Sequence, residues 1–353
     1  MKYAGWLFLC LLLIFRLVTY NPGFQEGQKI RIRAKITSDP IKYSFYQSFW
    51  LAGLKLSLPA YPEVSYGDLV VVEGRVEGKE LKEATLVSQE KRAGYLVKLR
   101  EKLLNIYKKS LPQPHASLLA GVVLGVKSGI PDWFWQALKK SGTAHVVVAS
   151  GMNVSLVASF LVSFLVLIIS RQKAIPFALA GIWIYAAICG MDAPIIRAAI
   201  MGSIAFSAQA VGRITYAWKG LFLSAMVMLF IKPVWFGDIG FILSFTATAS
   251  ILAFEPKVKK IFAFLPQFIR GSWATALAAQ LGVAPILFLT FGQYSLWSPL
   301  INTLVAWTIA PMTVIAGLAG IIGLAWPALG KVLVYLAYPL TYFFIGMVNF
   351  FSR

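Results

Sequence analysis

Long apolar runs, separated by short polar or basic segments, fill the second half of this chain. Each run approaches the roughly 20 residues that an α-helix needs to cross a bilayer. Pro311 lies inside one run and is expected to kink or split it. A further apolar stretch, Tyr3 to Tyr20, is followed by no small-residue cleavage motif, so we interpret it as a retained first span. The later runs predict spans near residues 144–170, 174–190, 194–211, 220–232, 239–254, 272–291, 299–325 and 329–351.

Between the first span and residue 92, the pattern changes to the two-residue alternation of half-buried strands. In residues 29–36 the bases fall on one face and the apolar side chains on the other. Five short strands in succession favour a small barrel of the OB-fold type. The other candidate strands are residues 43–50, 51–58, 68–76 and 81–88.

The next segment has helical periodicity and a strongly basic face. Residues 94–110 repeat apolar side chains at helical spacing, which predicts an amphipathic helix on a membrane surface. Residues 118–126 and 133–138 are apolar but too short to span, so we expect re-entrant or interfacial helices there. The bases on the polar face of the first helix are Lys98, Arg100, Lys102, Lys108 and Lys109.

Together these patterns predict a polytopic α-helical membrane protein with a small extracytoplasmic all-β domain, an OB-like barrel, near the N-terminus. The composition agrees, since 58% of the residues are hydrophobic and the mean hydropathy is +0.72. The predicted units are a first transmembrane helix (1–20), the β domain (21–92), the amphipathic and re-entrant helices (93–140) and the polytopic membrane domain (141–353).

The net charge of +19 is unevenly distributed. Residues 111–353 carry 15 Lys and Arg but only four acids, a balance that favours anions, although loop anchoring explains many of these bases. Basic loops alternate with the segments 191–193 and 292–298, which carry none. The positive-inside rule then places the basic loops and the N-terminus in the cytoplasm, and the β domain outside the cytoplasmic membrane.

A polar insert at residues 141–154 interrupts an otherwise apolar stretch. It contains His145, Ser150, Gly151 and Asn153, residue types that break or hydrate a helix. Irregular backbone at membrane depth is tolerated only where it is buried in protein or lines a water-filled cavity. The insert therefore predicts a broken helix whose polar groups line a pathway, with interhelical hydrogen bonding as the alternative.

Arg197 is the strongest single candidate in the membrane domain. It lies a few residues inside a predicted span, where a guanidinium faces either a cavity or a partner. One interpretation is a basic position that attracts phosphates at a pore mouth, and the other is an ion pair with Asp192. Gln280 and Asn302 are weaker candidates for lining the same pathway.

In the β domain, a row of bases and a group of aromatic residues suggest binding to single-stranded DNA. OB-folds combine a positive groove with aromatic rings on which bases stack. The alternative is a solvated strand over an aromatic core, and acids on the later strands, among them Glu73, weaken the DNA interpretation if they share that face. The candidate DNA-binding residues are Lys29, Arg31, Arg33, Lys35, Phe45 and Tyr46, with Tyr43, Phe49 and Trp50 as further stacking surfaces.

No constellation of catalytic residues emerges, so we expect no enzymatic activity, no cofactor and no metal. A phosphate-binding loop with Gly-Lys-Ser or Gly-Lys-Thr is missing, so transport would need an external motor or a gradient. The two histidines, His115 and His145, are too few for a His-rich two-metal site. Asp238 precedes an apolar run and is expected to cap its helix.

Five short segments, in order along the chain, resemble the signature of the ComEC competence-protein family. Each is weak alone, but their order is specific, and the family also carries an extracytoplasmic OB-like domain before its membrane domain. Many members carry a metallo-β-lactamase-like domain, which we expect this chain to lack, and often a His where this chain has Asn153. The segments are 141–154, Ile196–Met201, Gly237–Phe245, Ala279–Pro285 and Ser298–Asn302.

The resemblance implies a channel that translocates single-stranded DNA across the cytoplasmic membrane during natural transformation. It implies membrane lipids, a separate nuclease and a cytoplasmic motor as further partners, and it leaves the oligomeric state open. The alternative is a membrane transporter or export component for another anionic substrate, with the β domain as a protein-docking module.

Overall fold

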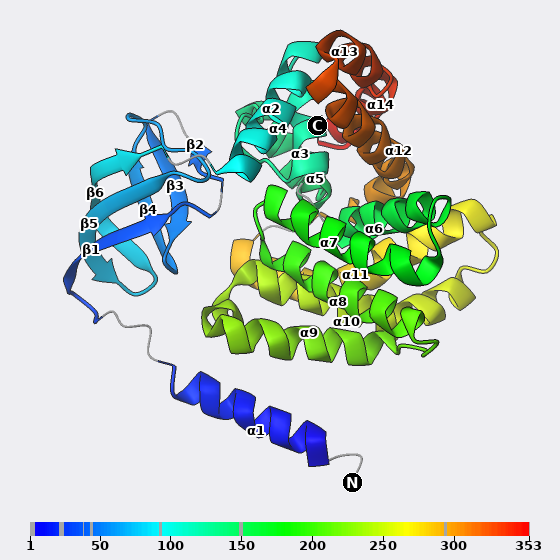
Figure 1. Ribbon diagram of the computed structural model, residues 1–353, viewed down its shortest axis with the longest axis horizontal. Helices are drawn as coiled ribbons and strands as arrows, with labels where there is room; N and C mark the ends of the chain where they lie inside the picture. The colour runs from blue at the N-terminus through cyan, green and yellow to red at the C-terminus, as the bar shows by residue number, and fades with distance from the viewer. Residues whose placement is uncertain are drawn as a thin grey trace.

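The computed structural model describes residues 4–20, 25–37, 39–42, 45–91, 94–147, 151–292 and 295–352. A β-sheet near the N-terminus is followed by a large set of apolar helices, and the sheet sits at one side of the helices (Figure 1). The predicted fold class, a polytopic helical membrane protein with an N-terminal β domain, is confirmed.

The sheet has the order β1-β5-β6-β4-β3-β2 and pairs its strands antiparallel except β4 with β6. All five predicted strands are present, with a short additional strand, β2. β1 and β2 form the two opposite edges of the sheet, although only a short connection separates them in sequence. The sheet therefore curls, and its inner face encloses one apolar core. The strands are β1 (Lys29–Lys35), β2 (Ile41–Lys42), β3 (Tyr46–Leu51), β4 (Leu54–Pro59), β5 (Leu69–Glu77) and β6 (Glu80–Glu90).

The predicted surface helix is α2 (Tyr95–Ser110), and its environment differs from the prediction. It packs against α12 (Ser298–Ala325) and α13 (Pro327–Tyr335), with Tyr107 fully buried and donating to the Ala316 carbonyl oxygen at 2.9 Å. Arg100, which was assigned to the polar face, is only 3% exposed. The assignment was wrong because Arg100 has an acidic partner, Asp39, in the connection between β1 and β2, and helical periodicity alone does not reveal such a partner.

Five helices, or six if one bent pair counts as a single span, are long and apolar enough to cross a membrane. Fewer helices meet this measure than the sequence predicted: α9 (Ala217–Ile231) has 15 residues, and so has α1 (Ala4–Val18), which packs against α9 through Leu13. The candidate spans are Ala144–Val166, a stretch that includes the undescribed residues 148–150, then α8 (Ala193–Ala210), α10 (Ile239–Ile261), Ile269–Thr290 within α11 (Gln267–Phe291), and α12, with α13 and α14 (Tyr338–Ser352) as the bent pair.

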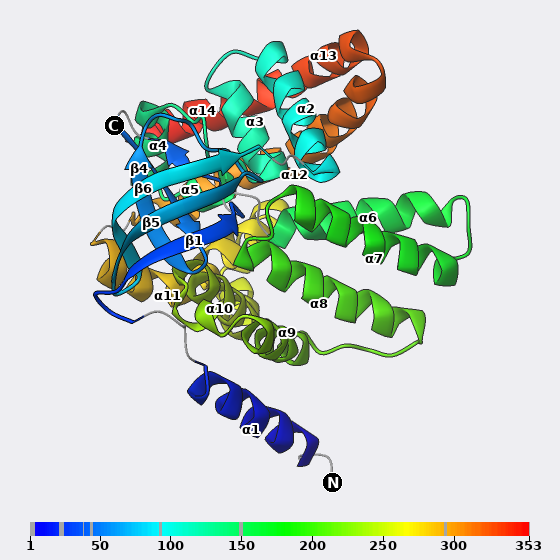
Figure 2. The same cartoon turned by 60° about the vertical axis from the view of Figure 1, so that its left-hand side comes forward.

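The connections between the helices complete the architecture. Helices α6, α7 and α8 run side by side away from the sheet, with the turn between α6 and α7 and the end of α8 remote from it (Figure 2), and α9 packs against α8. Pro311 does not split its run, since α12 is one continuous helix of 28 residues. Asp238 caps α10 as expected, its Oδ1 accepting from Phe241 N at 2.7 Å. The remaining elements are α3 (His115–Leu124), α4 (Asp132–Lys140), α5 (Ala144–Val147), α6 (Gly151–Val166), α7 (Arg171–Ile188) and the 3-10 helix η1 (Pro233–Gly237).

The sheet is joined to the helices by a set of polar contacts, which we call the docking contacts. Arg100 of α2 donates from both Nη atoms to the Asp39 carboxylate, at 3.1 and 2.6 Å, and its guanidinium lies 4.4 Å from the Tyr66 ring centroid. Tyr66 donates to the Ala187 carbonyl oxygen at 3.4 Å. Lys79, in the turn between β5 and β6, donates to the Gly237 carbonyl oxygen of η1 at 3.2 Å. These contacts fix the sheet over the nearby helix ends.

Candidate functional site

The turn that precedes α5 contacts the start of α12. Gly142 has a positive φ of 71°, and a Cβ there would lie 2.7 Å from Ser298. The Ser298 hydroxyl donates to the Gly142 carbonyl oxygen at 3.2 Å and accepts from Asn302 Nδ2 at 3.0 Å. The small residue at 142 thus permits a close approach that joins the first of the five segments singled out in the sequence, 141–154, to the last, Ser298–Asn302.

Arg197 joins three helices. Its Nη1 donates to the Ser244 carbonyl oxygen and to the Thr248 hydroxyl of α10. On the other side it meets α6, because a Cβ at Gly151 would lie 2.8 Å from Arg197 Nη2. A side chain at position 151 would require the guanidinium to shift from this position. Helices α6, α8 and α10 therefore meet around one cation.

Helices α10 and α11 approach each other closely one turn further along. A Cβ at Gly282 would lie 2.7 Å from both Cβ and Oγ of Ser250, and Ser250 donates to the Ala278 carbonyl oxygen at 2.7 Å. Helix α11 also packs against α12. The five segments singled out in the sequence thus lie on or beside successive neighbours in a closed series of helix contacts, α6–α8–α10–α11–α12 and back to the turn before α5. We call this series the motif ring.

No acidic side chain in the described part of the chain balances the charge of Arg197. None forms an ion pair with it, and its Nε is buried without a hydrogen-bond partner. The alternative of a pair with Asp192 was wrong: Asp192 Oδ2 lies 3.6 Å from Lys127 Nζ instead. Arg197 lies about one turn inside α8, and both of its hydrogen-bond acceptors are neutral oxygens. A guanidinium inside a membrane helix with neutral partners alone is suited to bind an anion.

Asn153 lies in a drier environment than a pathway-lining role requires. Its side chain is fully buried, with Nδ2 donating to the Val122 carbonyl oxygen of α3 at 2.6 Å, while Oδ1 has no partner. The interhelical hydrogen bond that was the alternative for this residue is therefore present. Asn302 behaves similarly, with its Oδ1 buried and unpaired. Asn153 thus links α6 to α3, and Asn302 holds the Ser298 hydroxyl that reaches the Gly142 turn.

The other predicted residues of the pathway are distributed around these contacts. His145 is exposed on α5, and Gln280 is half-buried on α11. Gly151 lies against Arg197, as described above. Ser150 lies outside the described residues. The structure thus brings Gly151 and Arg197 together, and Asn302 with the 141–143 turn.

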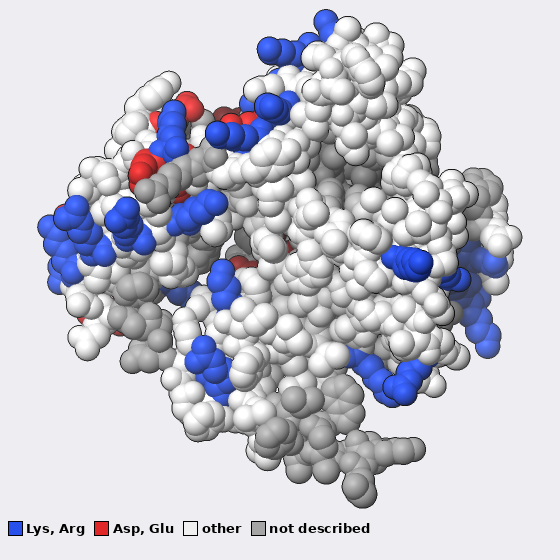
Figure 3. Space-filling model, in the orientation of Figure 1, with Lys and Arg blue, Asp and Glu red and all other residues white. Residues whose placement is uncertain are grey.

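The bases of β1 share one exposed face, as predicted, but two of them are paired with acids. Arg31 Nε lies 3.5 Å from Glu73 Oε1, and Arg33 Nη2 lies 3.9 Å from Glu90 Oε2. Lys29 and Lys35 form no ion pair among the described residues. Basic side chains gather on this side of the sheet in Figure 3. Half of the predicted charge therefore remains available to an anion.

The aromatic candidates differ in exposure. Phe45 is 88% exposed and Tyr46 44%, and Trp50 lies on the same outer face of β3 as Tyr46. Tyr43 lies outside the described residues. These exposed rings are on β3, near the sheet edge opposite to β1, and exposed aromatic rings are groups on which bases can stack.

Sequence reasoning missed the residues that complete the ring on α10. Ser244 and Thr248 accept from Arg197, and Ser250 contacts α11. Ser244 and Thr248 are four residues apart and so lie on one side of α10, while Ser250 faces α11; small polar residues in an apolar helix were the available signal.

The fold and the motif ring define a class: a polytopic membrane protein whose helices meet around an uncompensated cation, with a β domain held at one end. The profile of the Competence protein family matches residues 122–353, which include every helix of the motif ring. The chain belongs to this family.

Two characterised relatives resemble the chain over its membrane part. ComE operon protein 3 of Bacillus subtilis (strain 168) is 25% identical over 210 residues, 59% of this chain and 26% of the relative. Competence protein ComA of Neisseria gonorrhoeae is 25% identical over 217 residues, 56% of this chain and 30% of the relative. The chain thus spans less than a third of the length of these relatives. No solved structure matches it.

Proposed function

We propose that this chain forms the membrane pathway through which single-stranded DNA crosses the cytoplasmic membrane during natural transformation. The observation that carries the proposal is Arg197, a half-buried cation without an acidic partner among the described residues, at the meeting point of α6, α8 and α10. Membership of the competence family supports DNA as the anion. Neutral oxygens around Arg197, such as the Thr248 hydroxyl, would hydrate a phosphate backbone without trapping it.

The arrangement of charges supports an orientation with the β domain outside the cell. The basic turns that follow α6 and α8 lie at the ends remote from the sheet (Figure 2). Bases are expected on the cytoplasmic side, so the sheet, the docking contacts and the start of α8 with Arg197 would face the exterior. DNA would then meet Arg197 early on its way inward.

Deletion of the gene tests the function directly. We expect the deletion strain to bind labelled DNA at its surface but to accumulate no DNA that is protected from external nuclease. Complementation with the full chain should restore protection. Normal internalisation in the deletion strain would contradict the proposal, and simultaneous loss of surface binding would indicate a receptor rather than a channel.

The exposed face of β1 and the rings of β3 are proposed to guide the strand to the helices. In detergent-solubilised full chain, a fluorescent oligonucleotide should bind without sequence preference and weaken as salt rises, as counterion release demands. Lys29→Gln with Lys35→Gln should weaken binding and reduce the salt slope by about one to two, because these bases have no acid beside them.

Arg31→Gln with Arg33→Gln is the matched control for that measurement. Both arginines already pair with acids, so the same loss of charge should cost less affinity. Equal losses in the two double variants would show that the local ion pairs do not decide binding. Complete lack of oligonucleotide binding at low salt would favour the second candidate function, transport of another anionic substrate with the β domain docking a protein. A separate nuclease and a cytoplasmic motor are proposed partners in the first case.

A further inference from the structure

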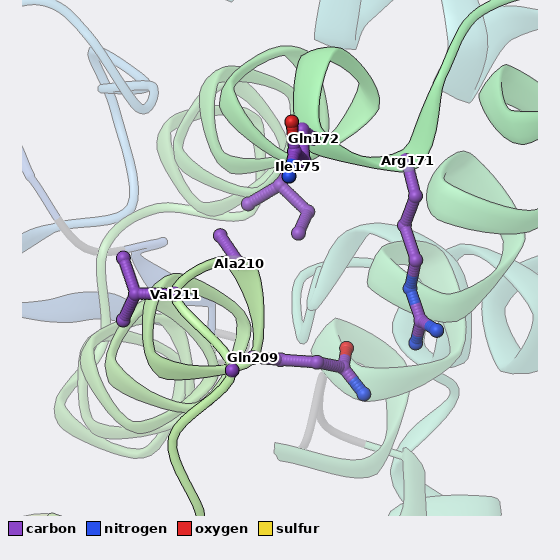
Figure 4. A pocket seen from close by; sticks show the side chains of 7 residues that line it. Arg171, Gln172, Ile175, Gln209, Ala210 and Val211 are labelled. Carbon is purple, nitrogen blue, oxygen red and sulfur yellow. The ribbon is translucent and has the colours of Figure 1, made fainter.

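A hollow of about 600 Å³ lies between the turn that joins α6 to α7 and the turn that joins α8 to α9. Arg171 and Gln172 of α7 and Gln209 of α8 line it, with Ile175 and Val211 as apolar walls. Figure 4 shows the Arg171 guanidinium and the Gln209 carboxamide extended toward the same side of the hollow. We call it the turn pocket. Gln209 lies about 18 Å from Arg197 along the axis of α8, because an α-helix rises about 1.5 Å per residue.

The polar groups of the turn pocket suit an anion. Arg171 supplies a permanent charge with several donors, and the two glutamines supply amide donors. Lys173 and Arg213 add exposed bases nearby. Two carbonyl oxygens at the end of α8 are already hydrogen-bonded, which reduces their repulsion of an anion. Ala208 O accepts from the backbone N–H groups of Val211 and Arg213, and Gln209 O accepts from that of Gly212. The acid of α8, Asp192, lies at the other end of that helix.

The rim of the turn pocket is apolar and strongly exposed. Leu167 is 83% exposed and Ile214 is 88% exposed, and both lie in the turns on either side. Large apolar side chains in short turns next to bases are unfavourable in bulk water, but they suit the boundary between headgroups and acyl chains. Both turns directly follow candidate spans, Ala144–Val166 and α8, so they stand at a membrane surface.

We propose that the turn pocket binds the phosphate of an anionic phospholipid, with its glycerol and acyl chains along Val211 and the apolar rim. Basic pockets between transmembrane helices on the side of the basic loops recognise anionic headgroups in this way. The apolar rim favours a lipid over a free phosphate ion, which would use only the polar half of the site. The proposal does not depend on what passes through the motif ring.

Lipid retention by the purified full chain tests the proposal. The chain is incubated in detergent with phosphatidylglycerol or phosphatidylcholine, and bound lipid is counted by native mass spectrometry. We expect phosphatidylglycerol to be preferred about fivefold, the effect of one basic side chain at an anionic surface. Arg171→Gln should abolish the preference. Lys260→Gln, which removes an exposed charge from the end of α10, should keep it.

Three outcomes would overturn the assignment. The first is an unchanged preference in Arg171→Gln. The second is an equal loss in Lys260→Gln, which indicates diffuse surface charge and not a site. The third is complete displacement of phosphatidylglycerol from the unaltered chain by inorganic phosphate, which indicates a free-anion site. Thermal unfolding of each variant in the same detergent, expected to match the unaltered chain, ensures that lipid loss is not a consequence of misfolding.

Discussion

Arg197→Ala is expected to lower DNA internalisation by about tenfold to a hundredfold while the protein stays in the membrane at its normal level. A hydrogen bond to a charged group contributes about 1.5–3 kcal/mol, and each 1.4 kcal/mol is a factor of ten. Arg197 is the group whose charge the ring leaves unmatched, so its contact with a phosphate would be of this kind. Nuclease-protected label per cell, divided by membrane abundance, gives the measurement.

Two further variants separate a functional role of Arg197 from a structural one. Thr248→Val removes one of its acceptors at nearly constant volume and should reduce uptake much less. Arg197→Lys keeps the charge but loses the fork of donors, so intermediate uptake is expected. Arg213→Ala removes an exposed arginine at the far end of α8 and is the matched control. Normal uptake in Arg197→Ala would return the residue to a purely structural link between α8 and α10.

Arg100→Met is expected to destabilise the seating of the sheet by about 3–5 kcal/mol, because removal of one partner leaves a buried charge uncompensated. Burial raises the pKa of Asp39, and Arg100 opposes that rise. Without Arg100 the folded carboxyl takes up a proton more readily than the unfolded one. The loss of stability in Arg100→Met should therefore be smallest near pH 3.8, the ordinary pKa of an Asp carboxyl, and should grow as the pH rises through the raised pKa of Asp39. Protease cleavage between β6 and α2 provides the measurement of opening.

The double variant Asp39→Asn with Arg100→Met should recover part of the loss, since it leaves no lone charge behind. Arg31→Met breaks an exposed pair with Glu73 and should cost at most about 1 kcal/mol. Cleavage that is as slow in Arg100→Met as in the unaltered chain would show that Tyr66 and Lys79 hold the sheet without the ion pair. The comparison thus ranks the docking contacts.

The strands and most helices could be predicted because their signals are local. Alternation of side chains marked β1 and β5, and apolar length marked α10 and α12. The sequence did not reveal which helices remain short, as α9 does, because a helix end depends on its turn and on packing. Arg100 was misplaced for a related reason, because its partner Asp39 is 61 residues away in the sequence. Helical periodicity predicts that a charged side chain is exposed to solvent unless such a distant partner is known.

The candidate site was foreseeable as a set of residues and not as a set of contacts. Gly151 and Arg197 were both singled out, yet nothing local indicated that the glycine makes room for the guanidinium. Asn153 was expected beside water and is buried, since an amide in an apolar helix has the same sequence signal whether it faces a cavity or a neighbouring carbonyl. Ser244 was missed because it accepts through its backbone carbonyl, which carries no side-chain signal, and Thr248 because hydroxyl groups are common in membrane helices.

The docking contacts bear on how a ligand of the sheet would find the helices. A domain on a slack tether searches a volume, and its ligand arrives at the membrane with a concentration set by the tether length. Here Arg100, Tyr66 and Lys79 seat the sheet directly on the ends of α7, η1 and α2. A DNA strand bound by β1 or β3 would therefore reach the helices at one place and in one orientation. The fixed position of the sheet would also set the length of DNA between the sheet and the helices.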